Sequence, residues 1–309
     1  MNIYTDIPDC GAFANPVLTI GSFDGVHLGH HRILSVLLNT ARERSGDAVV
    51  LTFRDHPRAV LTPHTPPKIL TTADEKIEAI GEHGVSHIIM LPFTRAMAEM
   101  SAEEFLGEMV LKKLGVTGLV VGYDHAFGKN RAGTFDFLRS VSHERGFGVV
   151  RVEPRNFYSR PVSSTWIRTE LEDGNVALAA MLLGRRYRFG GTVVRGAGRG
   201  RTIGFPTANV RPDDPAKVIP RDGVYAVTVS LPGGLRRQGM LNIGTNPTFA
   251  ETERTIEVNI FDFEADIYGA PIGVFFHERI RDEVRFADAR ELAAQIERDR
   301  RAALELLNE

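Results

Sequence analysis

The chain has 309 residues, of which 43% are hydrophobic, so it is long enough for one large domain or two ordinary domains with buried cores. The formal net charge of −2 excludes the global basic field that attracts nucleic acid. Cys10, the one cysteine, excludes an intramolecular disulfide, residues 1–10 do not read as a secretory signal, and no apolar run approaches the roughly 20 residues of a membrane-spanning helix. We therefore expect a soluble, cytoplasmic protein without a nucleic-acid or membrane partner.

The first motif along the chain is residues 21–30, with the sequence GSFDGVHLGH. It follows an apolar run at 17–20 that predicts a buried strand, and it precedes apolar residues at 33–38 with helical spacing. A strand, a glycine-rich turn and a helix start present backbone N–H groups and the positive end of a helix to a phosphate. Gly21 and Gly25 suit the tight turn. The motif therefore predicts a phosphate site.

Two histidines strengthen this prediction. His27 and His30 are three residues apart, so on a helix they share one face and can both donate to phosphate oxygens. Gly29 between them allows a close approach of the backbone to a ligand. Two alternatives remain at this point: a tight turn with two surface histidines, and a metal site, which we do not expect a third histidine, cysteine or carboxylate to complete.

Strands and helices alternate through the rest of the first half. Apolar runs predict strands at 48–53, 87–91, 118–122 and 149–152, and helical patterns lie at 72–80, 101–114 and 135–144. Thr72 with Glu75 and Ser101 with Glu104 have the spacing of capping boxes. This alternation predicts a parallel sheet with helices on its faces and ligands beyond the carboxyl ends of the strands.

Polar motifs follow several of these strands. They are residues 52–57 (TFRDHP) and residues 121–133 (VGYDHAFGKNRAG). A third motif, residues 163–168 (SSTWIR), begins a helix. Hydroxyls and N–H groups at a helix start, with Arg168 one turn later, form a second phosphate cradle. Taken singly, Ser163 or Ser164 is equally a plain helix cap, and Arg131 is more often a solvated loop cation.

Together, and in this order, the motifs between about residues 15 and 175 resemble the HxGH nucleotidyltransferases, most closely the adenylyltransferase half of the bifunctional riboflavin kinase/FAD synthetases. The resemblance implies a Rossmann-like domain that transfers the adenylyl group of ATP to FMN and releases pyrophosphate. It implies catalytic roles for His27, His30 and Arg168. It further implies ATP contacts at Gly21, Ser22, Phe23, Asp24, Gly25, His27, His30, Asp124, Ser163, Ser164, Thr165 and Arg168, and flavin contacts at His56, Pro57, Phe127 and Arg131.

The composition changes after a short helix at 175–183, which Gly184 is suited to end. Residues 184–201 are rich in glycine and arginine, for which a solvated basic loop contacting RNA is the alternative to a nucleotide loop. Short, turn-bounded strands at 224–229, 239–243, 255–261 and 272–276, followed by a helix at 288–307 that Asp288 and Glu291 can cap, predict a small antiparallel barrel. We therefore expect two domains, 1–183 and 184–309.

The second half resembles the riboflavin kinase half of the same family, above all in the string GFPTAN at 204–209. The resemblance implies that Glu257 is the catalytic base, with Asp262 the next candidate and an exposed strand glutamate the alternative. It also implies ATP contacts at Gly191, Gly196, Gly198, Thr207, Asn209 and Tyr268, flavin contacts at Arg281 and Phe286, and Mg²⁺ ligands at Thr207 and Asn209.

The two halves together predict ATP-dependent conversion of riboflavin to FMN and then to FAD, with Mg²⁺ as cofactor and these small molecules as partners. Ser22, Asp55, His125 and Asn259 depart from the residues usual in the family. The first three leave open a kinase with a weak or inactive adenylyltransferase half. A non-catalytic flavin-binding regulator and a cytidylyltransferase are further alternatives, and the sequence decides neither for nor against a homo-oligomer.

Overall fold

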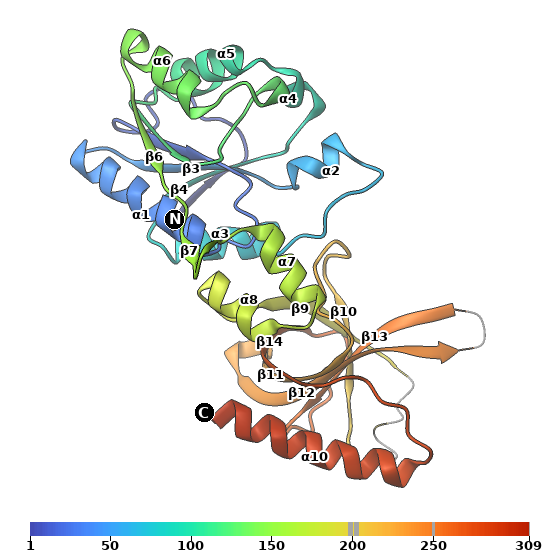
Figure 1. Cartoon of the computed structure of the whole chain (residues 1–309). Coiled ribbons are helices and arrows are strands. Elements are labelled where there is room, and N and C mark those ends of the chain that lie inside the picture. The colour runs from blue at the N-terminus through green and yellow to red at the C-terminus, as the bar shows by residue number, and fades with distance from the viewer. Residues whose placement is uncertain (197–199, 201–203, 249–250, 309) are drawn as a thin grey trace. The chain divides into compact units, whose positions relative to one another are not determined.

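The computed structural model describes residues 1–196, 200, 204–248 and 251–308. The chain divides into two compact units, Met1–Ser164 and Thr165–Glu309, which differ in architecture (Figure 1). Within the described residues, no helix combines the length and the apolar character needed to cross a membrane.

The first unit is built on a six-stranded, fully parallel sheet. The spatial order is β1-β4-β3-β2-β5-β6, so the chain runs outward from β2 to one side and then restarts on the other side at β5. Ligands of such sheets bind where the strand order reverses, beyond the carboxyl ends of the two central strands. The strands are β1 Asn2–Tyr4, β2 Val17–Ile20, β3 Ala48–Phe53, β4 His87–Leu91, β5 Gly118–Gly122 and β6 Gly148–Val152.

Helices cover both faces of this sheet (Figure 1). Leu34 and Leu37 of α1 (Leu28–Glu43) and Ile80 of α3 (Ala73–Gly81) pack on one face. Phe105 and Leu138 lie in the cluster on the other face, on η1 (Phe105–Lys113) and α6 (Phe135–Arg145). Burial from both sides explains why the strands are nearly continuous apolar runs. The shorter elements are α2 Pro57–Leu61, α4 Arg95–Glu99, α5 Ala102–Glu104, η2 Lys129–Arg131, β7 Asn156–Phe157 and β8 Arg160–Pro161.

Both predicted capping boxes are present. Thr72 accepts from the N–H of Glu75 at 3.3 Å and donates its own N–H to that carboxylate at 3.0 Å, and Ser101 and Glu104 make the same exchange. The helix that begins at Ser101 differs from the expected form, because from Phe105 it continues as the wider π-helix η1.

The second unit begins with two helices, α7 (which starts at the last residue of the first unit, Ser164–Glu172) and α8 (Val176–Leu183). Gly184 ends α8 in the left-handed conformation at φ 75°, as predicted. A closed barrel follows in the order β10-β13-β12-β11-β14-β9, and neighbouring strands pair antiparallel. Its elements are β9 Arg188–Val194, β10 Ala208–Pro212, β11 Gly223–Ser230, η3 Pro232–Gly234, β12 Arg236–Thr248, β13 Glu251–Ile260 and β14 Pro271–Arg281.

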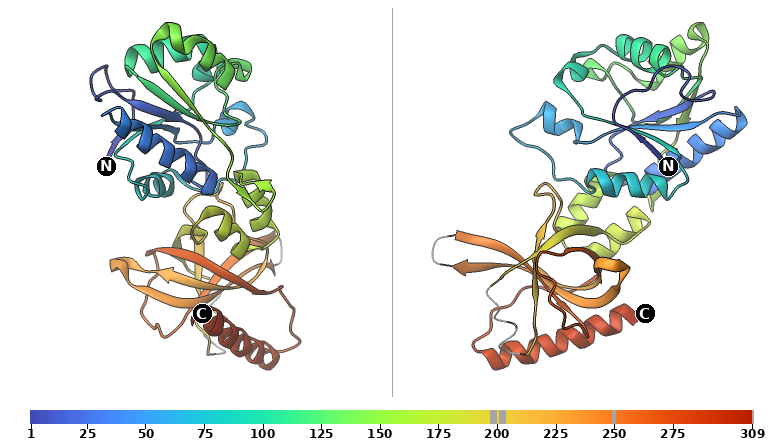
Figure 2. Two further views of the ribbon diagram at one scale, coloured as in Figure 1. Left: turned by 60° about the vertical axis from the view of Figure 1, so that its left-hand side comes forward. Right: turned by 180° about the vertical axis from the view of Figure 1, so that it is seen from behind.

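The C-terminal helix α10 (Ala289–Asn308) runs along the side of the barrel in both views of Figure 2. Ala303 packs with Ala226 and Met240 in a small core between helix and barrel. Asp288 caps the helix by accepting from the N–H groups of Arg290 at 2.8 Å and Glu291 at 2.9 Å. The predicted fold class, a Rossmann-like sheet followed by a small barrel and a C-terminal helix, is confirmed.

Candidate functional site

The two histidines of the first motif form a reciprocal cap at the start of α1. Nδ1 of His27 accepts from the N–H groups of Gly29 at 3.1 Å and His30 at 3.4 Å, and Nδ1 of His30 accepts from the N–H of His27 at 3.3 Å. The rings stack with their centroids 3.7 Å apart. Because each Nδ1 is an acceptor, the neutral ring of each histidine carries its proton on Nε2. The fold thus provides two Nε2–H donors side by side at a helix N-terminus.

The turn before this cap has a strained backbone. Phe23 at φ 48° and Val26 at φ 38° are in the left-handed region, and both side chains are buried. A β-branched residue adopts such a conformation only where its surroundings enforce it, and such residues cluster at functional sites. A Cβ added at Gly29 would lie 3.0 Å from Cε1 of His27, so this glycine makes room for the capping ring.

Asp24, predicted to contact ATP, ties the turn to two other segments. Its carboxylate, with the residue only 3% exposed, accepts from the N–H groups of Leu70 at 2.9 Å and Thr71 at 3.0 Å. The Thr71 hydroxyl accepts from the N–H of Gly25 at 3.0 Å. The Asp24 carbonyl accepts from the hydroxyl of Ser164 at 2.9 Å. The Asp24 carboxylate therefore joins the turn to the segment before α3, and the Asp24 backbone carbonyl joins it to Ser164, the first residue of α7.

The end of β3 lies beside the same turn. The Thr52 hydroxyl donates to the carbonyl of Ser22 at 3.2 Å, and the N–H of Gly21 donates to the carbonyl of Leu51 at 3.1 Å. His56, a predicted flavin residue, caps α2 by accepting from the N–H of Arg58 at 3.2 Å, and Pro57 is the first residue of that helix.

The loop after β5 carries the other predicted flavin and nucleotide residues. The Asp124 carbonyl accepts from the guanidinium of Arg131 at 3.1 Å, and Arg131 is left-handed at φ 60°. His125 lies in this loop, directly after Asp124. Burial lowers the pKa of its imidazole to about 4, against a raising effect of Asp124, so the ring is neutral at physiological pH. Its buried Nε2 has no hydrogen-bond partner among the described residues.

Phe127 lies with the core of the first unit. Its ring is 5.4 Å from that of Phe105 and 6.4 Å from that of Phe137, and its backbone pairs with Gly133. The proposed flavin contact of Phe127 thus remains a prediction, and the structure gives the ring a packing role.

The structure joins the turn of residues 21–25, His27, His30 and Ser164 in one network. Ser163 precedes α7. Thr165 and Arg168 lie on α7, in the second unit, and their approach to phosphates remains a prediction.

Glu257 lies at the centre of a polar cluster on the barrel. On β13 it is opposite Asn209 of β10 and opposite Asn242 of β12, so the three side chains share a face. The hydroxyl of Thr207 donates to Oε2 of Glu257 at 3.1 Å. The predicted base and both predicted metal ligands are therefore neighbours, although Glu257 is on β13, whereas Thr207 directly precedes β10 and Asn209 lies on it.

The oxygen atoms of this cluster are suited to bind Mg²⁺. A hydroxyl that donates its proton to Glu257 keeps its lone pairs for a cation, and the Asn209 amide supplies a second hard oxygen. A Cβ at Gly196 would overlap the Asn209 amide, so the backbone at Gly196 lies directly against the cluster. The described part of the chain holds no group of three or more histidines, cysteines or acidic residues placed to bind a metal. A cation here would take the rest of its ligands from phosphates and water.

Asn259, which departs from the residue usual in the family, has a defined contact. Its side chain is buried, and Nδ2 donates to the carbonyl of Pro206 at 2.7 Å, directly before Thr207. Two residues beyond Glu257 on the same strand, it lies on the same face. This strand periodicity was the sequence signal that could have indicated its role.

Of the other predicted ATP residues, Gly191 lies on β9, where a Cβ would come 2.6 Å from Cγ1 of Val210. Tyr268 is exposed, with the Arg195 guanidinium 5.4 Å from its ring centroid. Gly198 lies outside the described residues.

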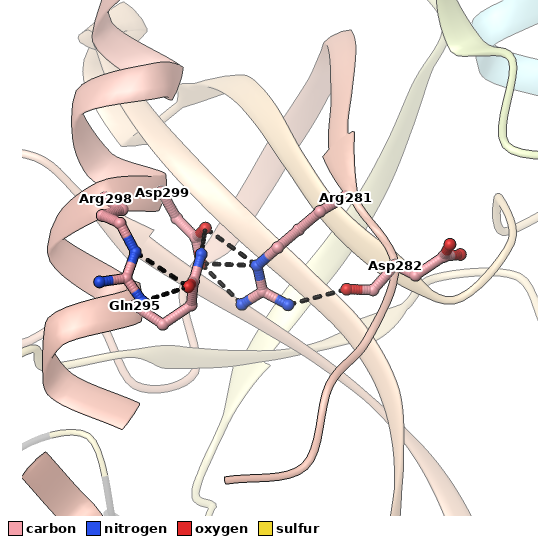
Figure 3. A network of polar contacts seen from close by, with 5 residues as sticks. All are labelled: Arg281, Asp282, Gln295, Arg298 and Asp299. Carbon is pink, nitrogen blue, oxygen red and sulfur yellow. Dashed lines mark hydrogen bonds and ion pairs between the residues drawn. The ribbon is translucent and has the colours of Figure 1, made fainter. Parts of the chain in front are cut away.

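Arg281, a predicted flavin residue, ties β14 to α10 (Figure 3). Its guanidinium donates to both carboxylate oxygens of Asp299, at 2.9 Å from Nε and 2.7 Å from Nη2. Gln295 donates to the same carboxylate at 2.8 Å. The ring of the second predicted flavin residue, Phe286, has its centroid 5.8 Å from the guanidinium carbon.

Comparisons with known proteins match a different family model to each half of the chain. A family model described as FAD synthetase matches residues 12–166, and one described as riboflavin kinase matches residues 183–307. The bifunctional riboflavin kinase/FMN adenylyltransferase of Escherichia coli K12 is 40% identical over 291 residues, covering 94% of this chain and 92% of the relative. The protein of the same name from Bacillus subtilis is 37% identical over 295 residues, with the same coverage.

Among solved structures, the crystal structure of a Streptococcus pneumoniae protein named macrolide-efflux protein has a TM-score of 0.88 and 33% identity. It covers 97% of this chain, which covers 98% of it in turn. The fold, both family models and the full-length relatives lead to one conclusion: the chain belongs to the bifunctional riboflavin kinase/FMN adenylyltransferase family.

Proposed function

We propose that this chain phosphorylates riboflavin to FMN with ATP and then transfers the adenylyl group of a second ATP to FMN, giving FAD and pyrophosphate. The observation that supports this proposal is that one chain carries two separate polar clusters, each with donors suited to phosphates. The reciprocal histidine cap lies in the first unit, and the cluster of Thr207, Asn209 and Glu257 lies in the barrel.

In the kinase step, the 5′-hydroxyl of riboflavin attacks the γ-phosphorus of ATP, a new O–P bond forms, and ADP leaves. The hydroxyl must lose its proton as it attacks, and Glu257 is the carboxylate that accepts it. The hydrogen bond from Thr207 holds one carboxylate oxygen and leaves the other oxygen for this transfer.

Mg²⁺ at Thr207 and Asn209 would neutralise charge on the ATP phosphates. Gly196 lies against the Asn209 amide, and the glycine-rich stretch to which Gly191 and Gly196 belong is the candidate cover of the phosphates. Tyr268, Arg281 and Phe286 are proposed as contacts at the edges of the two substrates.

In the adenylyl step, a phosphate oxygen of FMN attacks the α-phosphorus of ATP, and pyrophosphate leaves. The attacking group is already an anion, so this step needs charge stabilisation and positioning more than a base. We assign the Nε2–H donors of His27 and His30 to the phosphate oxygens, with Ser164, Thr165 and Arg168 completing the site. The loops around His56 and Phe127 are assigned to the flavin.

We assign the adenylyltransferase to residues 1–183 and the kinase to residues 184–309, in a chain that works in the cytoplasm. An intracellular location is supported by the requirement for ATP in both steps and by the exposed, unpaired Cys10.

The test is a time course of the purified chain with riboflavin, ATP and Mg²⁺, in which the flavins are separated by chromatography. The proposal predicts that FMN appears first and FAD follows. Accumulation of FMN without FAD, even when FMN is supplied, would favour a chain with one active half. Absence of both products would refute the proposal.

A further inference from the structure

Lys76 is a buried cation next to the candidate adenylyltransferase site. It lies on α3 with the residue only 4% exposed, and its ammonium donates to the carbonyl of Phe53, the last residue of β3, at 2.6 Å. Lysine is almost never fully buried unless it is paired.

The surroundings of Lys76 connect three segments of the site. The charged groups that act on it across the fold are Asp24, on the turn after β2, and Asp55, directly after β3. The Asp24 carboxylate in turn holds Leu70 and Thr71, which lead into α3. One ammonium therefore lies where the turn after β2, the end of β3 and the start of α3 meet.

We propose that Lys76 is a positioning residue of the adenylyl transfer, whose ammonium holds the end of β3 against the Asp24 turn and so fixes the histidine donors and the segment of residues 54–57. This inference rests on the proposed function and adds a residue to its first site. Without the positive charge, the buried Asp24 carboxylate loses the electrostatic attraction of Lys76, and the end of β3 loses the hydrogen bond from the ammonium to the Phe53 carbonyl.

The charge of Lys76 titrates in an accessible range. Burial lowers its pKa from 10.5 to about 8, while Asp24 and Asp55 act in the opposite direction. Adenylyl transfer should therefore fall as the pH rises through about 8. Since the folded pKa is the lower one, the unfolded chain binds more protons between about pH 8 and 10.5, and this group's contribution to stability rises over that range. Loss of this proton therefore does not itself destabilise the fold over that range.

The experiment compares the full-length wild type with Lys76→Met and Lys76→Arg. FAD formation from FMN is followed between about pH 6.5 and 9.5, with kcat and KM separated, and riboflavin phosphorylation by the same samples reports an intact second site. Lys112→Met is the matched control, because Lys112 is exposed on η1 and pairs only with Glu108 within the described residues.

We expect Lys76→Met to lower kcat for FAD formation about 10–100-fold at pH 7, the scale of a misplaced reacting group. The variant should show no alkaline fall near pH 8. Lys76→Arg, which stays charged, should also lack that fall and keep more of the rate, and Lys112→Met should match the wild type.

Wild-type kcat in Lys76→Met at pH 7 would overturn the inference, and so would an unchanged alkaline fall in both variants. If Lys76→Met does not fold, the pH profile of Lys76→Arg decides alone. If the wild type makes no FAD from FMN at any pH, the proposed function fails and the inference fails with it; an active wild type with an indifferent Lys76→Met refutes the inference only.

Discussion

The two nitrogens of the His27 ring have separate roles in this structure, and two substitutions can separate them. Nδ1 accepts the helix-capping hydrogen bonds of α1, whereas Nε2 carries the proton that we assign to phosphate binding. In His27→Asn the side-chain oxygen takes the place of Nδ1, so the cap remains and the Nε2 donor is lost. In His27→Gln the amide nitrogen takes the place of Nε2, so the donor remains and the cap is lost.

The magnitudes follow from the contacts. One capping bond is 3.1 Å long and the other is 3.4 Å, so we expect the loss of the cap to cost about 1 kcal/mol. For a unit the size of Met1–Ser164 this lowers the melting temperature by about 2–4 °C. Loss of a donor that acts in the transition state should lower the rate roughly 10²–10³-fold.

The assay measures FAD formation from FMN together with calorimetric unfolding, and uses riboflavin phosphorylation as the internal control. His27→Asn should melt like the wild type and lose the adenylyl rate, and His27→Gln should melt earlier and keep most of that rate. If His27→Asn forms FAD at the wild-type rate, Nε2 is not the donor and the assignment of the rings is wrong.

Two further predictions concern the barrel. Residues 165–309 should fold alone and phosphorylate riboflavin. Residues 184–309 should do the same with a lower melting temperature, because they lack α8, which packs against β14. A folded 165–309 fragment that makes no FMN would contradict the assignment of the kinase. Asp299→Asn should lower the free energy of unfolding of the 165–309 fragment by about 3 kcal/mol. This is the low end of the range for a broken buried ion pair, because the Arg281 side chain is 20% exposed. An unchanged urea denaturation curve would show that the ion pair in Figure 3 does not hold α10 against the barrel.

Local signals in the sequence predicted much of this fold. The capping boxes at Thr72 and Ser101, the C-cap at Gly184 and the cap at Asp288 depend only on residues a few positions apart, and all four are present. The alternation of apolar strands with amphipathic helices determined the parallel sheet for the same reason.

Elements without a local signal were missed. β1 has three residues, too few for a periodic pattern. β9 lies in the stretch rich in glycine and arginine that we assigned to a loop, and only closure of the barrel makes Phe189 and Val193 inward-facing. The π-helix η1 follows an ordinary capping box, which carries no information on the width of the later turns.

In the candidate site, too, some features could be predicted from the sequence and others depend on the packed structure. Resemblance to a family indicated Glu257, Thr207 and Asn209, but their proximity depends on strand register, which no spacing in the sequence reveals. Histidine is not a usual N-cap, so the capping role of His27 was not expected. A lysine in an amphipathic helix such as α3 is ordinarily on the solvent side, so only the packed structure identifies Lys76 as buried.

The central claim is that two independent sites on one chain act in series, and Glu257→Gln tests it most directly. The glutamine keeps the size of the side chain and the acceptor for Thr207 but cannot take up a proton, so riboflavin phosphorylation should fall by about 10²–10⁴. FMN supplied directly should still become FAD at nearly the wild-type rate, because His27 and His30 belong to the other site. Wild-type phosphorylation by the variant, or an equal loss of both reactions in a folded protein, would contradict the account.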